Sequence, residues 1–549
     1  MTEKYEAVVV GAGPAGSAAA YELARHGVQV LVLERGKEPG AKNVTGGVLY
    51  GQTDTPYNLD YLLPGFEHEA PVERSIGKLA MHAMAGDKVK TLDLDRLHKW
   101  RTKWAWSVLR VPFDRWFAER VHREAKKHSG GVLSNVTATG PLLHEGKIIG
   151  VQTAELDPIR ADVVIAADGA TSEMARKAGL WDWQPSSKWF QGAKVVLKSS
   201  SSDIEARFGV HGRDGVAHLF AGDVFGGVRG GGFLYTNKDT LSVGTVFHLD
   251  ALEQANTPPH ELLDKLLRHP FFLDLVGGSL EELEYSAKLI PDGKKCELPQ
   301  PWKDRMLVCG DAAGQMWAAG PIIKGMNLGI TAGVLAAQSY IEAKAAGKPH
   351  QAGPRYASKV KRSYVWQSMH APPVAAMRSL AENRFVDGIQ RAIVGGLARG
   401  SAAQAEKLMS SPRLASAAPD TEFVYVGLPA MVASAHGQRA ASKHEAKLRT
   451  LDERIASLKY DTAIGKPHIL LMDDNPGVSG KAVHTCPVSS PSSTRGCYRI
   501  EDQRDEKGNV TKFVAFDVQP CIECGTCAIE AKTTWTHPPG GKGVQYDWG

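Results

Sequence analysis

The sequence predicts an α/β fold built on a parallel sheet, with an inserted antiparallel sheet and a cysteine-rich module near the C-terminal end. Three observations predict this fold class. A glycine-rich turn joins an apolar strand to a small-residue helix at residues 7–24, short alternating runs separated by glycine clusters occupy residues 181–310, and a triplet of cysteines stands at residues 521–527. At 549 residues the chain is long enough for two to four domains.

The glycine-rich turn is the most informative motif of the chain. Residues 7–10 predict a buried parallel strand, and the six residues after it are Gly11, Ala12, Gly13, Pro14, Ala15 and Gly16. Glycines here permit a tight bend and a close approach of the backbone to a pyrophosphate, while the N-terminus of the following helix attracts negative charge. A second strand ends on Glu34, 18 residues after Gly16, where a carboxylate can accept a hydrogen bond from a ribose hydroxyl. The motif predicts a dinucleotide site, and an ordinary strand–turn–helix unit is the alternative.

Two later apolar strands also end on an aspartate. Residues 163–167 lead into Asp168 and Gly169, and residues 306–309 lead into Gly310 and Asp311. An aspartate there can bond a sugar-alcohol chain, and for a flavin the N-terminus of the next helix would stabilise the charge that develops on reduction. The residues expected at the start of that helix are Gly325, Met326 and Asn327. Three strand ends thus predict one elongated ligand, while aspartates that merely cap helices are the alternative.

Further cofactor contacts are predicted outside the strand ends. The adjacent Gly46 and Gly47 would let the backbone pass close to a flat ring system, and a surface loop is the alternative. The other side chains expected at the cofactor are Arg35, Arg110 and Val136.

Five of the seven cysteines fall within the last 64 residues. Because the first predicted strand begins at residue 7, we expect no export signal, and clustered cysteines then indicate metal rather than disulfides. Cys521, Cys524 and Cys527 have two residues between neighbours, a spacing that binds an iron–sulfur cube and leaves backbone N–H groups free to bond its sulfides. Zinc is the alternative, but zinc sites pair cysteines in separated hairpins.

A fourth cluster ligand must come from upstream, because Ala531 stands where a local fourth cysteine would fall. Cys486, followed by Pro487, has the expected cysteine–proline form and is the predicted ligand. Cys497 is the alternative fourth ligand. The predicted metal ligands are therefore Cys486, Cys521, Cys524 and Cys527.

These motifs together resemble a known family. The glycine turn, residues 161–169 and Gly310-Asp311 resemble the FAD domain shared by aromatic hydroxylases, prenyl reductases and electron-transfer flavoprotein:quinone oxidoreductases, over residues 1 to about 345. Residues 284–291 and 310–337 are most similar to the last group, including its nitrogen-fixation relatives. The resemblance implies an FAD-binding (glutathione-reductase-like, Rossmann) domain with an inserted antiparallel β domain. The region after residue 465 resembles the ferredoxin-like companion of the nitrogen-fixation flavoprotein, which implies a C-terminal α+β ferredoxin-like domain with a [4Fe-4S] cluster.

Four regions are expected from the motifs and the resemblance together. They are a discontinuous FAD-binding domain at 1–185 and 300–345, an antiparallel quinone or substrate domain at 186–299, a helical region at 346–464 and a ferredoxin-like [4Fe-4S] domain at 465–549.

A flavin and a cluster on one chain predict a relay, because flavins couple one-electron to two-electron chemistry and clusters move single electrons. By resemblance, the donor is the two-subunit electron-transfer flavoprotein and the acceptor is a membrane quinone, menaquinone or ubiquinone. Some relatives belong to electron-bifurcating complexes. No side chain is predicted as a catalytic acid or base. An FAD-dependent prenyl reductase or monooxygenase-like enzyme, and an electron-carrier subunit without its own quinone chemistry, are the alternatives.

The net charge and the hydropathy of the chain limit which kinds of partner we expect. The formal charge of +5 is small for this length, and we expect no nucleic-acid partner. No uninterrupted apolar run reaches 18 residues, so no segment is expected to span a bilayer. Residues 384–399 place an apolar stripe beside basic residues, which suits a helix in a membrane interface or a soluble helix packed on a core. With the resemblance, this predicts a cytoplasmic protein that lies peripherally on the inner face of the cell membrane.

Overall fold

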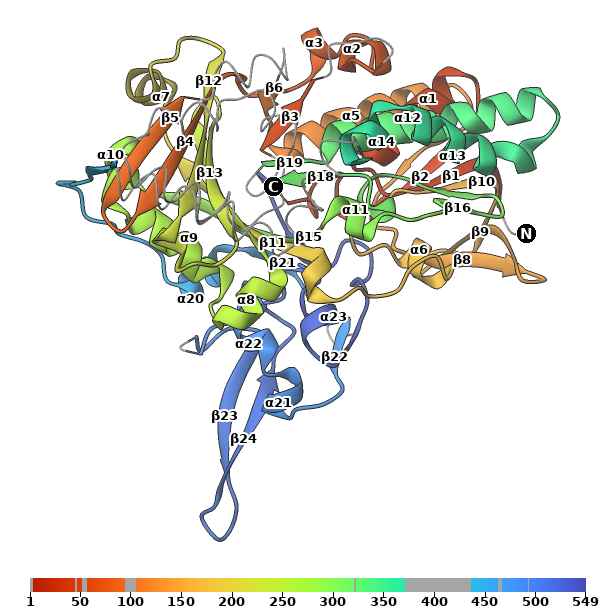
Figure 1. Cartoon of the computed structure of the whole chain (residues 1–549). Coiled ribbons are helices and arrows are strands. Elements are labelled where there is room, and N and C mark those ends of the chain that lie inside the picture. Colours follow the sequence, from red (N-terminus) through yellow and green to blue (C-terminus); the bar gives the residue numbers. More distant parts are fainter. Residues whose placement is uncertain are drawn as a thin grey trace, which may run out of the picture.

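The computed structural model describes residues 3–44, 47–51, 57–93, 105–319, 322–370, 436–462, 467–491 and 493–549. Two large sheets lie side by side, and the last part of the chain packs below them in the view of Figure 1. The expected interfacial helix at 384–399 and residue Gly46 lie outside the described residues. Among the helices that the structure describes, none has both the length and the apolarity needed to cross a bilayer.

The first sheet is the parallel sheet that the glycine turn predicts. Its parallel core runs in the order β17 (Met306–Val308), β10 (Ile159–Ala166), β1 (Lys4–Val10), β2 (Val30–Leu33) and β7 (Gly131–Leu133). The antiparallel strands that extend it are β16 (Trp302–Lys303), β9 (Lys147–Thr153) and β8 (Ala138–His144). Since the core strands are parallel, β1, β10 and β17 deliver their carboxyl ends to one edge of the sheet, where open α/β folds bind ligands.

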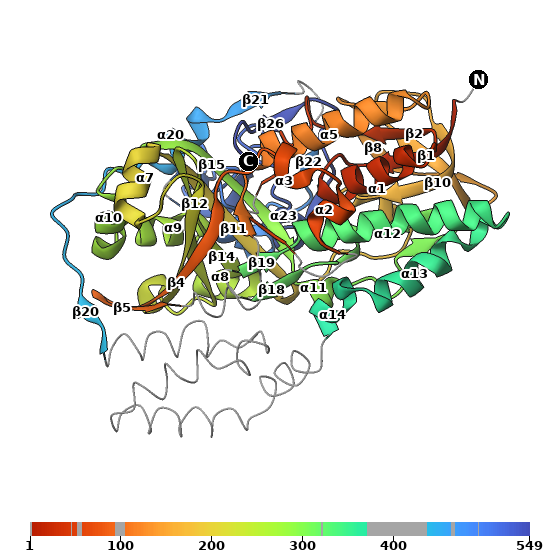
Figure 2. The ribbon, with the colours of Figure 1, turned by 90° about the horizontal axis from the view of Figure 1, so that it is seen from above.

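Three helices cover one face of the first sheet, namely α1 (Pro14–Arg25), α5 (Arg110–Lys126) and α12 (Met326–Ala345). Small residues let α1 and α12 approach closely, because a Cβ atom at Gly333 would lie only 2.1 Å from the carbonyl oxygen of Ala15. Two further helices follow α12 and pack beside it in Figure 2, α13 (Ala352–Arg362) and α14 (Tyr364–His370). This α/β unit matches the predicted Rossmann-like fold.

The second sheet is predominantly antiparallel, as the alternating runs predict. Its strand order is β15 (Glu282–Pro291), β11 (Trp189–Lys198), β14 (Thr240–His248), β13 (Gly230–Thr236), β12 (Asp214–Gly222), β4 (Ser75–Ala85), β5 (Lys88–Asp93) and β20 (Gln438–Arg439). Two short strands join beside β4, namely β3 (Val48–Tyr50) and β6 (Ala105–Ser107). Only the β12–β4 pairing is parallel among the described strands of this sheet. The sheet therefore draws strands from before residue 186 as well as from 186–299.

Four of the described helices turn apolar residues toward the second sheet and complete its core. They are α7 (Ser201–Phe208), α8 (Leu249–Ala255), α9 (Pro259–Arg268) and α10 (Pro270–Val276). The remaining short helices before residue 371 are α2 (Leu59–Leu62), α3 (Phe66–Glu69), α6 (Glu173–Lys177) and α11 (Gly293–Cys296), with one-turn 3₁₀ helices at Ser186–Lys188, Asp223–Phe225, Gly310–Ala313 and Pro349–Gln351. A small hairpin pairs β18 (Trp317–Ala319) with β19 (Ile322–Lys324).

We call the described residues from 467 to 549 the C-terminal module. They contain β22 (Ile469–Leu471), α21 (Pro476–Ser479), α22 (Lys481–Thr485), β23 (Tyr498–Arg504), β24 (Val510–Phe516), α23 (Cys527–Glu530), β25 (Thr533–Trp535) and β26 (Gly543–Gln545). Strands β23 and β24 form a hairpin that projects away from the body in Figure 1. The preceding α20 (Leu451–Ser457) and β21 (Lys459–Asp461) tie the module to the second sheet. Arg454 of α20 bonds Glu282 of β15, and β21 pairs with β26 of the module. Mixed short helices and hairpins are consistent with the expected α+β class.

Candidate functional site

A cavity lies where the carboxyl ends of the first sheet meet the second sheet. Of the predicted cofactor residues, fourteen line it: Gly11, Gly13, Pro14, Ala15, Glu34, Arg35, Arg110, Val136, Asp168, Gly169, Gly310, Asp311, Gly325 and Met326. Ala12, Gly16, Gly47 and Asn327 are described by the structure but do not line this cavity. The three predicted strand ends therefore converge on one cavity.

The glycine turn has the geometry that a pyrophosphate requires. Gly11 adopts a φ of +96°, and a Cβ atom there would lie 2.5 Å from the carbonyl oxygen of Ala167. Gly16 is equally constrained, because its Cβ would lie 1.9 Å from the carbonyl oxygen of Gly11. Only glycine fits both positions, so the turn stays tight and the N-terminus of α1 faces the cavity.

Glu34 is fixed at the end of β2 by two backbone donors. Its Oε2 accepts the N–H of Ala12 at 3.0 Å, and its Oε1 accepts the N–H of Gly36 at 2.7 Å. Ala12 thus orients the acid rather than lining the cavity itself. A carboxylate held in this way at the second strand can recognise the ribose of the adenosine half of a dinucleotide.

The two predicted aspartates differ in what they contact. The carboxylate of Asp168 accepts the Ser172 hydroxyl at 2.6 Å and the Met174 N–H at 3.0 Å, and burial raises its pKa to about 6. Asp168 therefore serves the turn before α6 as well as lining the cavity. Asp311 lies by the start of α12, with Oδ1 3.4 Å from the position that a Cβ of Gly325 would take. Burial raises the pKa of Asp311 and Arg110 opposes that shift.

The start of α12 presents its N-terminus to the cavity through Gly325, Met326 and Gly329. Asn327 is buried, and its carbonyl accepts the Tyr364 hydroxyl at 3.0 Å, so this residue links α12 to α14. An N-terminal dipole at this point stabilises negative charge on a bound ring.

The wall contributed by the second sheet is not predicted by the sequence motifs. Its members are Gly192, Ala193, Lys194, Phe233, Tyr235, Thr245, Val246, Lys288, Leu289 and Ile290. Burial lowers the pKa of Lys194 and of Lys288 to about 8. At Lys194, Arg110 reinforces this shift and Glu284 opposes it. At Lys288, Arg35 reinforces the shift and Glu523 opposes it. A weak signal exists for Lys194, which stands among apolar and small residues in the middle of β11. No such signal exists for Lys288, because β15 also carries Glu282 and Glu284.

All five cysteines of the C-terminal module are buried, and four of them are in mutual contact. The Cys486 thiol is hydrogen-bonded with Cys497 and Cys524, and Cys497 is also hydrogen-bonded with Cys521. The Val488 N–H and the Ser489 side chain bond the sulfur of Cys486, and the Glu523 N–H bonds that of Cys521 at 3.3 Å. Both candidates for the fourth ligand thus stand beside the triplet. Within the described ranges, no set of three or more His, Cys, Asp or Glu side chains has the geometry to hold a single metal ion.

Strand β15 separates the cysteine loop from the cavity. The Leu289 N–H donates to the carbonyl of Cys524 at 3.1 Å, and Lys288 Nζ donates to the carbonyl of Glu523 at 2.9 Å. Lys288 and Leu289 both line the cavity. One strand therefore contacts both sites.

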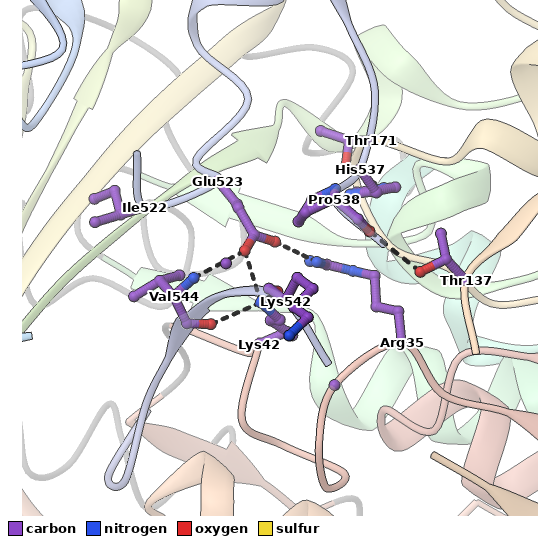
Figure 3. A network of polar contacts seen from close by, with 12 residues as sticks. Arg35, Lys42, Thr137, Thr171, Ile522, Glu523, His537, Pro538, Lys542 and Val544 are labelled. Carbon is purple, nitrogen blue, oxygen red and sulfur yellow. Dashed lines mark hydrogen bonds and ion pairs between the residues drawn. The ribbon is translucent and has the colours of Figure 1, made fainter. Parts of the chain in front are cut away.

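Glu523, between two of the cysteines, pairs with cations of the first part of the chain (Figure 3). Its Oε1 binds Lys42 Nζ at 2.7 Å and accepts the Val544 N–H at 3.1 Å, and Oε2 pairs with Arg35. Burial opposes ionisation of Glu523, but Lys42 and Arg35 hold its pKa well below the usual range. Arg35 and Lys42 line the cavity, so this ion cluster joins the cavity to the cysteine loop.

Comparisons with known proteins agree with the cavity geometry. A family model described as FAD dependent oxidoreductase matches residues 6–101, which include the glycine turn and Glu34. The protein FixC of Escherichia coli K12 is 38% identical over 340 residues, which cover 62% of this chain and 77% of FixC. FixC of Azotobacter vinelandii is 37% identical over 377 residues, covering 67% and 83%.

This chain belongs to the FixC family.

FixC-family membership makes it an FAD-dependent oxidoreductase. A further relative is the probable electron transfer flavoprotein-quinone oxidoreductase YdiS of E. coli K12, which is 37% identical over 344 residues, 62% of this chain and 77% of YdiS. Among solved structures, a geranylgeranyl bacteriochlorophyll reductase-like protein from Thermoplasma acidophilum has a TM-score of 0.50 at 19% identity, covering 66% of this chain and 84% of that one. This likeness supports the fold alone.

FAD fits the cavity of this FixC-family protein by the chemistry of its walls. The tight glycine turn suits the pyrophosphate, Glu34 suits the adenosine ribose, and the start of α12 suits the ring.

Proposed function

We propose that this FixC-family protein is an electron-transfer flavoprotein:quinone oxidoreductase, which passes electrons from the two-subunit electron-transfer flavoprotein through a [4Fe-4S] cluster and FAD to a membrane quinone. The observation that carries the proposal is the contact between the cysteine loop and the cavity wall. Leu289 lines the cavity, and its N–H bonds Cys524 directly. A relay needs its two redox groups this close, and YdiS, a relative of similar identity, carries the name of such an oxidoreductase.

The cysteine residues fit a cluster in their chemistry. The donor set consists of buried thiols, and backbone N–H groups already bond the sulfurs of Cys486 and Cys521. A cube binds its four thiolates through four different irons, so it does not require the ligand geometry of a single ion. We assign Cys486, Cys521, Cys524 and Cys527 as the ligands and the module as ferredoxin-like.

FAD, when bound, exchanges electrons singly or in pairs, and the cluster exchanges them singly. The groups of the protein itself bind the cofactor and orient it. The first turn of α12 and Lys194 bring positive potential to the ring end of the cavity, Asp311 holds the sugar-alcohol chain, and Glu34 holds the adenosine ribose. The second-sheet wall shapes the space for the quinone ring. We nominate no side chain as a proton donor.

The cellular setting follows from the same proposal. A quinone acceptor requires contact with a membrane, and the apolar and basic pattern at 384–399 supports peripheral binding at the inner face of the cell membrane. The proposed regions remain 1–185 with 300–345, 186–299, 346–464 and 465–549. The proposal extends to a role of this protein as a subunit of an electron-bifurcating complex.

The test uses the purified full chain under anaerobic conditions. We expect one FAD with about four irons and four acid-labile sulfides per chain, and reduction of a water-soluble ubiquinone analogue when reduced electron-transfer flavoprotein is supplied. Bound flavin without acid-labile sulfide would refute the proposed cluster. Oxygen consumption with an organic substrate would identify a monooxygenase, and absence of quinone reduction would identify a carrier subunit.

A further inference from the structure

The C-terminal module reaches the adenosine end of the cavity through residues 537–541, which we call the covering loop. Its Gly541 N–H donates to the carbonyl of Arg35 at 2.7 Å. Arg35 is the residue after Glu34, at the end of β2. Its Gly540 packs so tightly that a Cβ there would lie 2.0 Å from the carbonyl oxygen of Asn135, directly before Val136. The loop is therefore seated against the ends of β2 and β7, the strands that hold the adenosine half of a dinucleotide.

His537 lines the cavity from this loop. It belongs to the cavity wall together with Thr137 and Thr171, and Figure 3 shows these residues gathered beside Arg35. The Nε2 atom lies 3.4 Å from the Thr171 hydroxyl, and the Thr137 hydroxyl donates to the carbonyl of Pro538 at 3.2 Å. Burial, reinforced by Arg35 and Lys288, holds the pKa of His537 well below its usual range, so the ring is neutral. A neutral imidazole suits contact with an uncharged purine.

The covering loop is held independently at several points. The Gly540 N–H donates to Glu155 at 2.6 Å. Directly after the loop, the Lys542 carbonyl accepts from Lys42, the same lysine that pairs with Glu523. The loop and the cysteine segment are thus fixed on the first sheet by one set of contacts. Binding a ligand under the loop and docking of the module must then favour each other.

We propose that the covering loop forms part of the FAD site, with His537 as the wall residue for the adenosine half, so that the C-terminal module completes the cofactor site. FAD is the cofactor of the family, and this inference holds whether or not the cysteines bind iron. It assigns a cofactor-binding role to residues that the glycine motif and the strand ends do not include.

The test separates the two halves of the cofactor. Full-length apoprotein is prepared, and the dissociation constants of ADP and of riboflavin 5′-phosphate are measured by competition with FAD. We expect His537→Ala and Gly540→Ala to weaken ADP binding about tenfold, which is about 1.4 kcal/mol, and to change riboflavin 5′-phosphate binding by less than about twofold. Thr534→Ala, an exposed change on β25 three residues before His537, serves as the matched control and should alter neither.

Two outcomes would overturn the inference. ADP affinity retained in both variants would show that the loop does not contribute, and equal loss of affinity for both ligands would show that the loop has no specific role at the adenosine half. A measurement on the unaltered chain guards against variants that fail to fold. ADP should slow hydrogen exchange at the amides of Gly540 and Gly541 and leave the β23–β24 hairpin unchanged, and absence of this protection would also reject the proposal.

Discussion

Lys194 places a titratable charge on the cavity wall that the second sheet contributes. The residue lies in the middle of β11, bonds the carbonyl of Gly549 and is buried, which lowers its pKa to about 8. The charged form is therefore present below about pH 8 and is lost above it. A positive charge beside a flavin stabilises the reduced, more negative ring, so this lysine should tune the cofactor.

Lys194→Met is predicted to lower the flavin midpoint potential by about 30 mV, equivalent to about 1.4 kcal/mol for a two-electron couple. Because the lysine is charged only below about pH 8, the difference from the unaltered protein should be full at pH 6.5 and should vanish above pH 9. Spectroelectrochemical titration measures it. Lys198→Met, at the exposed end of the same strand, is the control. A difference independent of pH would contradict the prediction.

Arg454 is a fully buried arginine that docks α20 on the second sheet. It contacts both carboxylate oxygens of Glu282 at 2.7 and 2.8 Å and Asp264 at 2.8 Å. Glu282 itself is buried, so removal of the arginine would leave an uncompensated charge inside the protein.

Arg454→Ala is predicted to lower the free energy of unfolding by about 3–5 kcal/mol. Arg439→Ala removes an exposed ion pair with Asp87 and should cost less than about 1 kcal/mol. Chemical denaturation of the two variants compares them directly. The double change of Arg454→Met with Glu282→Gln should recover much of the loss, because it also removes the buried charge of Glu282 and leaves only the partly exposed Asp264 without its arginine. A double variant as unstable as Arg454→Ala would refute this account.

At the level of elements, the crossing of α1 and α12 depends on the absence of a side chain at Gly333. Alanine normally favours a helix interior over glycine by about 1 kcal/mol. Here its Cβ would meet the carbonyl of Ala15 at 2.1 Å, so the helices would have to separate.

Gly333→Ala is therefore predicted to destabilise the protein by about 1–3 kcal/mol despite its better helix propensity. The separation of α1 from α12 would also disturb the glycine turn, so FAD should be released more readily. Thermal unfolding and flavin retention after dialysis measure both effects. Gly77→Ala, where a Cβ meets open space, should leave both unchanged, and a stabilised Gly333→Ala variant would refute the packing argument.

Elements with local signals could be predicted from the sequence, and those fixed by distant pairing could not. The first strand, turn and helix are readable because Gly11, Gly16 and Glu34 have fixed spacing around a single turn. Lys194 on the cavity wall depends on the register of β11 against β14 and β15, which no local pattern specifies. His537 reaches the cavity only because the covering loop, far downstream of Glu34 in the sequence, packs on the first sheet. Asp168 shows what a strand-end motif does not predict. It lines the cavity as expected, but its carboxylate also accepts hydrogen bonds at the start of α6.

At the level of the whole molecule, the chain brings a flavin cavity and a cysteine group together through β15. The choice between Cys486 and Cys497 decides how the C-terminal module would bind a cluster. Cys486 stands beside Cys524 and its sulfur is bonded by the Val488 N–H and Ser489, as a cluster ligand would be. Cys497 contacts Cys486 and Cys521 instead.

Cys486→Ser is predicted to reduce iron and acid-labile sulfide to less than about half of the full complement of four, whereas Cys497→Ser should retain nearly all of both. Colorimetric iron and sulfide analysis of the purified variants measures this, with flavin content as the control for folding. The reverse pattern would identify Cys497 as the ligand and would correct the assignment made from the cysteine–proline motif.

Strand β15 stands at the end of the second sheet in the described part of the chain, and the cysteine loop bonds its outer side through Leu289. An uncovered terminal strand offers open backbone groups to any other polypeptide and is a common origin of aggregation. The loop therefore also shields this strand. Shortened versions of the protein without the C-terminal module should self-associate, and expression designs for the isolated flavin portion would need a charged or proline substitution on β15.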